Sequence, residues 1–270
     1  MGVSNTKNMI SIYTSAFNVI KGNFSYAEAI ANFCSFADEV VVAVNTSEDN
    51  TLQIFQNLAL LYKNLFIVQT NFSYTDPGLD GKIKNAALQA CAHDVCLQLD
   101  LDERVLLSQK KLWYNISNDL LAAQSHAIMV PVIDLFRDEK YIKSIGSKWY
   151  LHKRAGAYRG VVNFARLANG HHDTTKSDSC ELTDGWGNLL PSIYLLNPQS
   201  DIQTKLLSIK QYDLPYVVHY GYLDLDRRIQ LNKDFWSNHW SVEAGKQIDI
   251  PLDVNFFKDI PIIEHKLALL

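Results

Sequence analysis

The first hundred residues alternate short, apolar, β-rich runs with longer segments of helical periodicity. The runs at 9–14, 39–44, 65–69 and 95–99 predict strands, and the segments at 26–36, 51–62 and 81–92 predict helices. The run Glu39-Val40-Val41-Val42-Ala43-Val44 is almost continuously apolar, as is typical of a parallel strand covered on both faces. The alternation therefore predicts successive βαβ units, and an α/β protein with a mixed, mostly parallel central sheet flanked by helices.

The remaining residues follow a less regular pattern. A helix is predicted over about 108–123, a strand over 127–133, and a final amphipathic helix over about 224–243. The polar stretch 169–188 reads as a long functional loop. No internal repeat or linker interrupts the chain, so we expect one domain over 1–270, with a regular half at 8–105 and an elaborated half at 106–270.

Composition narrows the classes of function. The chain has 29 acidic residues against 25 Lys and Arg residues, and its formal charge of −4 argues against non-specific nucleic-acid binding. The sequence holds no apolar run of about 18 to 20 residues and its start is polar, so we expect a cytoplasmic protein with at most peripheral membrane contact. The four cysteines form no CxxC pair, and we expect them to be reduced core thiols.

Three acidic residues directly follow the fourth predicted strand. They are Asp100, Asp102 and Glu103. Ligands of open α/β sheets bind beyond the carboxyl ends of the strands, and paired carboxylates there suit Mg²⁺ or Mn²⁺, which in turn neutralises a diphosphate. A second Asp-x-Asp segment at 224–226 precedes a helical pattern instead, so its acids are expected in the first turn of a helix.

Four segments follow one another in this half of the chain: Ile10-Ser11-Ile12-Tyr13-Thr14 with Asn18, Val44 to Thr51, Lys82-Ile83-Lys84-Asn85-Ala86-Ala87, and Leu99-Asp100-Leu101-Asp102-Glu103. Taken in this order, they resemble the inverting nucleotide-sugar glycosyltransferases of the GT-A fold, in particular family 2. The resemblance covers roughly residues 8 to 105. The resemblance implies a GT-A fold, with a nucleotide-sugar-binding half at 8–105 and an acceptor-side half at 106–270.

The resemblance also implies roles for individual residues. Thr14 and nearby backbone would cradle the nucleotide, Asn45 would face the base or ribose, and Lys84 would lie near the diphosphate or ribose. Asp100 and Asp102 would hold the metal and the sugar nucleotide. The chain departs from the family pattern at Asn45, where an aspartate is usual, and in lacking the glycine of that turn, which leaves the identity of the base open. For Lys84, a solvated helix face is the competing interpretation.

An inverting transferase needs a carboxylate base opposite the leaving diphosphate. The resemblance places this base in the second half, where Glu181 and Asp184 fit best and Asp173 is third. The competing interpretation is that these acids solvate a loop. A solvated loop is also the favoured interpretation of the adjacent His171 and His172, because neighbouring side chains in an extended chain point apart.

Two further features carry alternative interpretations. His219 follows an apolar run, and it is either a third metal ligand, as C-terminal histidines are in some GT-A enzymes, or a hydrogen-bonded core residue. A basic, aromatic segment either guides an anionic acceptor or is an exposed strand; its charged residues are Lys148, His152, Lys153, Arg154 and Arg159.

These observations predict a metal-dependent glycosyltransferase, using Mn²⁺ or Mg²⁺, that moves a sugar from a nucleoside-diphosphate sugar to the hydroxyl of a glycan, lipid-linked sugar or other acceptor, with inversion. A catalytically silent sugar- or nucleotide-binding module is the alternative, because a fold alone does not prove chemistry. A haloacid-dehalogenase-type phosphatase is disfavoured because its motif usually lies on the first strand. A nucleotidyltransferase is disfavoured because Ser15-Ala16-Phe17-Asn18 is not a Gly-rich loop.

Overall fold

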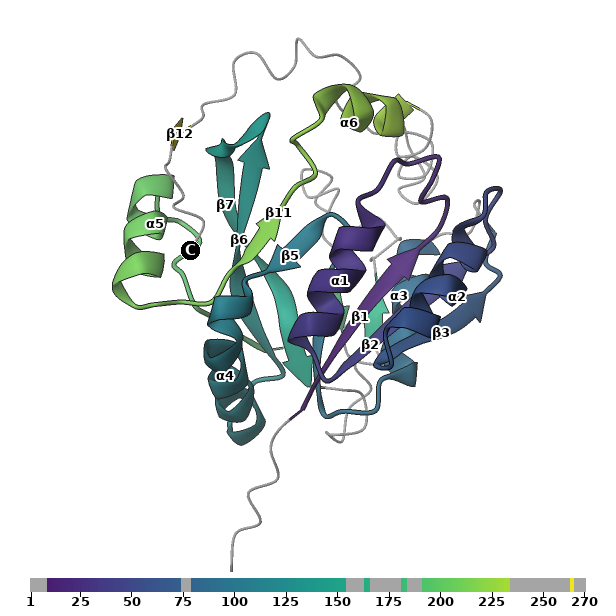
Figure 1. Cartoon of the computed structure of the whole chain (residues 1–270). Coiled ribbons are helices and arrows are strands. Elements are labelled where there is room, and N and C mark those ends of the chain that lie inside the picture. The colour runs from purple at the N-terminus through teal and green to yellow at the C-terminus, as the bar shows by residue number, and fades with distance from the viewer. Residues whose placement is uncertain are drawn as a thin grey trace, which may run out of the picture.

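A computed structural model describes residues 9–73, 79–153, 163–165, 181–183, 191–233 and 263–264 (Figure 1). Its first part confirms every predicted strand and helix, with bounds within two residues of those expected. The strands are β1 (Ile10–Ala16), β2 (Glu39–Asn45), β3 (Leu65–Thr70) and β4 (Val95–Gln98), and the helices are α1 (Tyr26–Phe36), α2 (Thr51–Leu61) and α3 (Leu79–Ala90).

The second part is more elaborate than predicted. The expected helix and strand appear as α4 (Lys110–Ala122), after the 3₁₀ turn η1 (Leu107–Gln109), and as β6 (Ala127–Phe136). The other elements are β5 (Glu103–Val105), β7 (Asp138–Lys153), β8 (Asn163–Ala165), β9 (Glu181–Thr183), β10 (Ser192–Tyr194), α5 (Ile202–Gln211), β11 (Val217–His219), α6 (Leu225–Leu231) and β12 (Ile263–Glu264).

Two boundaries of the second part need comment. The stretch 169–188 is not entirely loop, as was predicted, because β9 lies inside it and pairs antiparallel with β8. The last predicted helix begins as expected, with Asp224 as its N-cap accepting a hydrogen bond from the backbone of Arg227 at 2.9 Å. Residues 234–243 of that predicted helix lie outside the described residues.

One sheet joins strands from both halves of the chain. Its order is β3-β2-β1-β4-β7-β6-β11-β5, with β10 paired to β6 and β12 to β7. Strands β1 to β4 pair in parallel, and within this sheet only β7 and β5 run against the others. The predicted class is therefore confirmed: a mixed, mostly parallel sheet flanked by helices.

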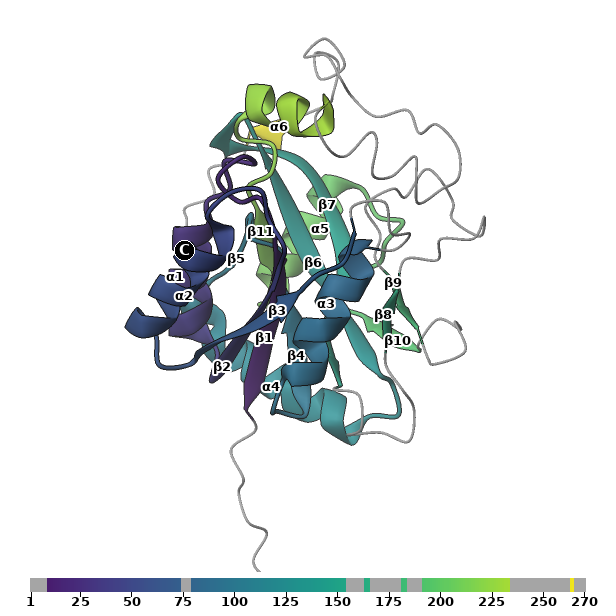
Figure 2. The same ribbon diagram turned by 90° about the vertical axis from the view of Figure 1, so that its right-hand side faces the viewer.

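Alternate residues of the parallel strands face different helices. Ile12, Val40 and Val42 belong to the core cluster that includes side chains of α1, α2 and α4, whereas Tyr13 and Val41 belong to the cluster with α3. This period of two explains why β2 is apolar from Val40 to Val44, since both of its faces are covered. Figure 2 shows α1 and α2 on one side of β1 to β3 and α3 on the other.

Strand β7 buries two basic residues that the sequence placed on an exposed or acceptor-guiding strand. His152 and Lys153 are both 0% exposed. The His152 ring lies 2.8 Å from the hydroxyl of Tyr13, and Lys153 donates to the carbonyl of Ala123 at 2.6 Å. Both earlier interpretations are therefore wrong for these two residues. Arg154 and Arg159 lie outside the described residues.

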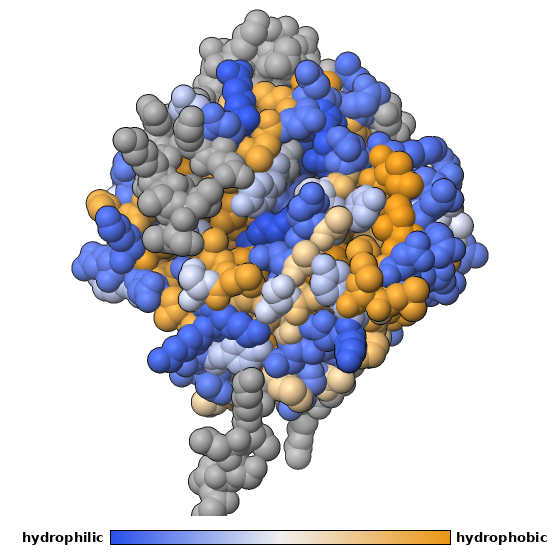
Figure 3. Space-filling view, viewed as in Figure 1, coloured by the Kyte–Doolittle hydropathy of each residue, from blue (hydrophilic) through white to orange (hydrophobic). Residues whose placement is uncertain are grey.

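Some apolar surface stays exposed. Figure 3 shows it on the face that carries α1 and α2, and Leu60, Leu61 and Phe66 at the α2–β3 edge are each more than half exposed.

Among the described residues, no helix is long and apolar enough to cross a membrane. Of the four cysteines predicted to be core thiols, Cys91 and Cys96 are buried, Cys34 is half-buried, and Cys180 lies outside the described residues.

Candidate active site

The turn that follows β4 is closed by its own acidic residues. The backbone N–H of Asp100 donates to Glu103 Oε2 at 2.8 Å, and the N–H of Glu103 donates back to the Asp100 carbonyl at 2.9 Å. Glu103 is fully buried. Arg104 donates to the carbonyl of Leu101 at 3.0 Å and reaches Ser25 at the start of α1. The turn is thus fixed to the first helix before any ligand binds.

The Asp100 carboxylate faces a lysine of α3. Lys84 Nζ lies 2.9 Å from Asp100 Oδ1 and 3.1 Å from Asp80, and Gln98 donates to the same Asp100 oxygen at 2.8 Å. Lys84 is only 4% exposed. The interpretation of Lys84 as part of a solvated helix face is therefore wrong: the lysine is a buried cation between two carboxylates.

Asp102 meets a histidine from the far end of the chain. His219 Nε2 lies 3.5 Å from Asp102 Oδ2, and the backbone N–H of Tyr220 donates to the Asp102 carbonyl at 2.8 Å. Burial acts against the charged forms, but the two groups stabilise each other. The pKa of Asp102 is held well below its usual range by the His219 imidazolium, and the carboxylates raise the pKa of His219 well above its ordinary value.

A third carboxylate, which the sequence analysis did not single out, contacts the other ring nitrogen. Asp134 Oδ1 lies 2.7 Å from His219 Nδ1, and the hydroxyl of Ser144 also donates to Asp134. Burial opposes ionisation, but these hydrogen bonds lower the pKa of Asp134 to about 2. Its one signal in the sequence is that Asp134 is the single charged residue in the apolar run 127–136.

A glycine makes room for the His219–Asp102 contact. A Cβ added at Gly221 would lie 2.4 Å from His219 Nε2 and 3.0 Å from Asp102 Oδ2. Any larger residue would therefore occupy the space where the two side chains meet. Because glycine has no Cβ, the edge of the His219 ring and the Asp102 carboxylate can lie next to each other.

Lys148 of β7 adds a second cation beside the acidic turn. Its Nζ lies 3.0 Å from Glu103 Oε1. Burial disfavours the ammonium form, but Glu103 foremost, with Asp100 and Asp134, raises the pKa of Lys148 above its ordinary value. Of the basic segment predicted to guide an anion, Lys148 is thus the residue that lies at the site.

The donor set at this turn suits a divalent cation. When two ligand atoms each bind such an ion at about 2.1 Å and the ligand–metal–ligand angle is about 90°, the two atoms lie roughly 3 Å apart. This separation is close to the 3.5 Å between Asp102 Oδ2 and His219 Nε2. Within the described part of the chain, no group of three or more His, Cys, Asp or Glu residues is arranged to hold a metal. Two protein ligands are enough for Mg²⁺ or Mn²⁺ when phosphate oxygens complete the coordination.

Thr14 and Asn45 lie at the carboxyl ends of β1 and β2, near the same edge. Thr14 is fully buried. The Asn45 amide accepts from Thr70 at 3.0 Å and from the N–H of Phe72 at 2.8 Å, and donates to the carbonyl of Phe72 at 3.0 Å. Asn45 therefore ties the end of β2 to the chain after β3, and its proposed contact with a nucleotide base or ribose stays a prediction.

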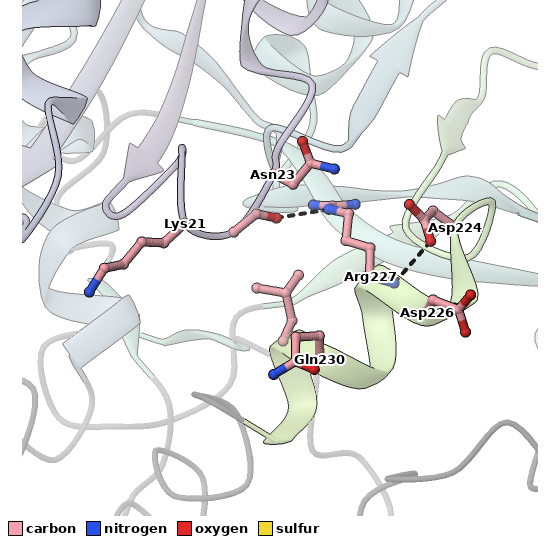
Figure 4. A pocket seen from close by; sticks show the side chains of 8 residues that line it. Lys21, Asn23, Asp224, Asp226, Arg227 and Gln230 are labelled. Atoms are coloured by element: carbon pink, nitrogen blue, oxygen red, sulfur yellow. Dashed lines mark hydrogen bonds between the residues drawn. The ribbon is translucent and has the colours of Figure 1, made fainter.

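A pocket borders the site where α6 meets the loop after β1. It has a volume of about 440 Å³ and is lined by Lys21, Gly22, Asn23, Asp224, Asp226, Arg227, Gln230 and Leu231 (Figure 4). Arg227 spans the two segments, because its Nε donates to the carbonyl of Gly22 at 2.8 Å and its guanidinium lies 4.7 Å from the ring centroid of Phe24. Helix α6 thus forms one wall of this pocket.

Of the acidic residues predicted to act as the catalytic base, the structure describes only Glu181. Glu181 begins β9, whose backbone pairs with Ala165 of β8, and β8 packs beside α3, the helix that carries Lys84. Asp184, Asp173, His171 and His172 lie outside the described residues. The assignment of the base to Glu181 or Asp184 stays a prediction.

Comparisons with known proteins give likenesses among solved structures. No family model and no curated protein matches the chain. S. aureus TarS 1-349 in complex with UDP aligns at 22% identity with a TM-score of 0.38, over 47% of this chain and 36% of that fragment. S. aureus TarS 1-349 aligns at 15% identity with a TM-score of 0.41, over 90% and 67%. Mannosyltransferase PcManGT from Pyrobaculum calidifontis, in complex with GDP-Man and Mn²⁺, aligns at 17% identity with a TM-score of 0.35, over 49% and 37%.

The first of these alignments thus covers only about a third of the TarS 1-349 chain. The fold class of the present chain follows from the strand order and pairing described above.

Proposed function

We propose that this chain is a metal-dependent glycosyltransferase of the GT-A type, which moves a sugar from a nucleoside-diphosphate sugar to an acceptor hydroxyl with inversion. The observation that carries the proposal is the pairing of Asp102 with His219 beside the Lys84–Asp100 ion pair, at the carboxyl end of a parallel strand. Divalent-cation ligands and a buried lysine at that edge suit a diphosphate.

In this proposal Asp102 and His219 hold the cation, and Lys84 and Asp100 contact the donor. When bound, the cation supplies neutralisation of the charge that builds up on the leaving diphosphate. Lys84 adds a fixed positive charge, since burial between Asp80 and Asp100 keeps it in place. The carboxyl ends of β1 and β2, which carry the buried Thr14 and Asn45, would form the nucleotide side of the same edge.

The acceptor hydroxyl must lose a proton as it attacks the sugar. We assign this step to Glu181 or Asp184. The contact between β8, the strand that pairs with β9, and α3, the helix that carries Lys84, supports Glu181. The acceptor is the hydroxyl of a glycan, a lipid-linked sugar or a similar molecule, and the reaction would take place in the cytoplasm.

The test is a donor screen with purified protein, Mn²⁺ or Mg²⁺, and UDP-, GDP- and dTDP-sugars. Thermal unfolding and release of nucleoside diphosphate are the readouts. A donor at about 100 times its Kd adds roughly 2.7 kcal/mol to the stability of the folded state. We expect one nucleotide to stabilise the protein only with metal, and Asp102→Asn to remove that effect.

Two other outcomes are informative. Metal-dependent stabilisation without release of nucleoside diphosphate, in the presence of a range of acceptors, would favour a silent binding module. No stabilisation by any nucleotide, with or without metal, would refute the transferase proposal.

A further inference from the structure

We infer that Asp134 is a positioning residue: it fixes the ring of His219 so that Nε2 points at the cation site beside Asp102. The inference rests on the proposed function, because it concerns how the metal ligand of that function is oriented. Asp134 does not face the donor itself. Its contact is with the nitrogen on the far side of the ring, at 2.7 Å.

The sheet dictates this contact. Strand β11 lies between β5 and β6, and its last residue, His219, is in register with Glu103 on one side and Asp134 on the other. Asp134 is in turn in register with Ser144 of β7, whose hydroxyl donates to it. Neighbouring residues in register on one face of a sheet bring their side chains together. Three adjacent strands thus align Ser144, Asp134 and His219 in one row that ends at Asp102.

The chemistry of the row selects one form of the imidazole. An ionised carboxylate only accepts hydrogen bonds, so Nδ1 of His219 must carry the proton that it shares with Asp134. A cation would bind in exchange for the Nε2 proton of the imidazolium, because the lone pair of the neutral ring then resides on Nε2, the nitrogen 3.5 Å from Asp102 Oδ2. A carboxylate behind a metal-binding histidine fixes both the tautomer and the ring orientation, and raises the basicity of the ligand nitrogen.

The surroundings leave the ring little freedom. Tyr222 packs edge-on against His219, with ring centroids 5.5 Å apart, and the absent side chain of Gly221 opens the space on the Nε2 side. The side chains of Asp134 and His219 are only 17% and 11% exposed. Each ring nitrogen faces a carboxylate, but Asp134 lies 2.7 Å from Nδ1 whereas Asp102 lies 3.5 Å from Nε2, so the closer contact with Asp134 is the one that fixes the ring.

Asp134→Asn tests the inference with little change of shape. An amide in place of the carboxylate is either a weaker acceptor or a donor, and as a donor it would force the proton onto Nε2, where it blocks the metal. We expect the affinity for Mn²⁺, measured by electron paramagnetic resonance of the free ion with UDP or GDP present, to fall by about 10- to 100-fold. Asp38→Asn is the matched control: Asp38 accepts from the N–H of Ile10 at 3.0 Å and from Tyr114, at the opposite end of the sheet.

A spectroscopic measurement needs no variant of Asp134. In wild-type protein with ¹⁵N-labelled histidine and Zn²⁺, long-range ¹H–¹⁵N spectra should show Nδ1 of His219 protonated and Nε2 bound, with the resonance assigned by its loss in His219→Gln. A metal bound through Nδ1, or an Asp134→Asn protein that binds Mn²⁺ within twofold of wild type, would overturn the inference and leave the proposed function standing. Wild-type protein that binds no Mn²⁺ with either nucleotide would overturn both.

Discussion

The substitution Gly221→Ala tests whether the space between His219 and Asp102 is a working part of the site. The backbone of Gly221 does not lie in the left-handed region, so alanine meets no conformational penalty there. The added Cβ, however, would lie 2.4 Å from His219 Nε2 and 2.8 Å from Cε1, where ordinary contacts begin at 3.4 Å. The effect of this substitution is therefore local and steric.

The size of the effect follows from these distances. Relief of the clash requires the ring or the backbone to move by 3.4 − 2.4 Å, or 1.0 Å. The ring is held at 2.7 Å by Asp134 on its other side, so the movement separates Nε2 from its place beside Asp102. A misplacement of about 1 Å in a catalytic site costs on the order of 10²-fold in rate, which corresponds to about 2.7 kcal/mol.

The assay compares wild type, Gly221→Ala and a second glycine variant. Gly146→Ala in β7 is a suitable control, because the added Cβ would contact only Cγ1 of Val132, at 3.2 Å. We expect Gly221→Ala to fold but to weaken Mn²⁺ binding in the presence of UDP or GDP and to lower transfer about 10²-fold, while Gly146→Ala binds Mn²⁺ like wild type. A folded Gly221→Ala protein with wild-type Mn²⁺ affinity would refute the argument that Nε2 faces the cation.

Three further predictions concern stability, each measured by urea unfolding. Burial lowers the pKa of His152 to about 4, so between pH 6.5 and 4 the unfolded chain binds the proton of this histidine more tightly than the folded chain does. The free energy of unfolding should therefore fall by about 3 kcal/mol as the pH falls through that window. A His152→Gln variant that keeps the full pH dependence would contradict this. Asp49→Ala removes an acceptor of two backbone N–H groups in the loop after β1, at 3.0 and 3.1 Å, and should cost about 1 to 2 kcal/mol; no loss would show that the loop is held elsewhere. Lys84→Met leaves two carboxylates without their buried cation and should cost about 3 kcal/mol, against little for the exposed Lys82→Met; equal losses would refute the buried pairing.

The front half of the fold could be predicted because its signals are local. In each βα unit the period of the apolar residues changes from two to 3.6 within about a dozen residues. Both faces of β2 are buried, as its apolar run indicates. The site at its edge was predicted for the same reason. Asp100 and Asp102 follow a strand, and the position of a strand end can be read from the sequence that precedes it.

The rest of the site depends on pairings between distant segments. That Asp134 contacts His219 follows from the register of β6 with β11, which are separated by 80 residues that include β7 and α5. His152 is similar: its basic neighbours suggested an exposed strand, yet β7 inserts beside β4 in the middle of the sheet and buries the ring against Tyr13. Such registers are set by the assembled sheet and not by local periodicity.

The chain contains an internal comparison that separates a motif from its setting. Leu-Asp-Leu-Asp occurs twice, at 99–102 and at 223–226. After β4 the two leucines are buried, at 0% and 4% exposure, and Asp102 is directed to His219. Before α6 the same residues begin a helix, where Asp224 caps the backbone of Arg227 and stays exposed. Identical side chains therefore form the turn of the candidate site or a helix cap according to the element that they adjoin, and the setting of the first copy follows from the strand that ends at Gln98.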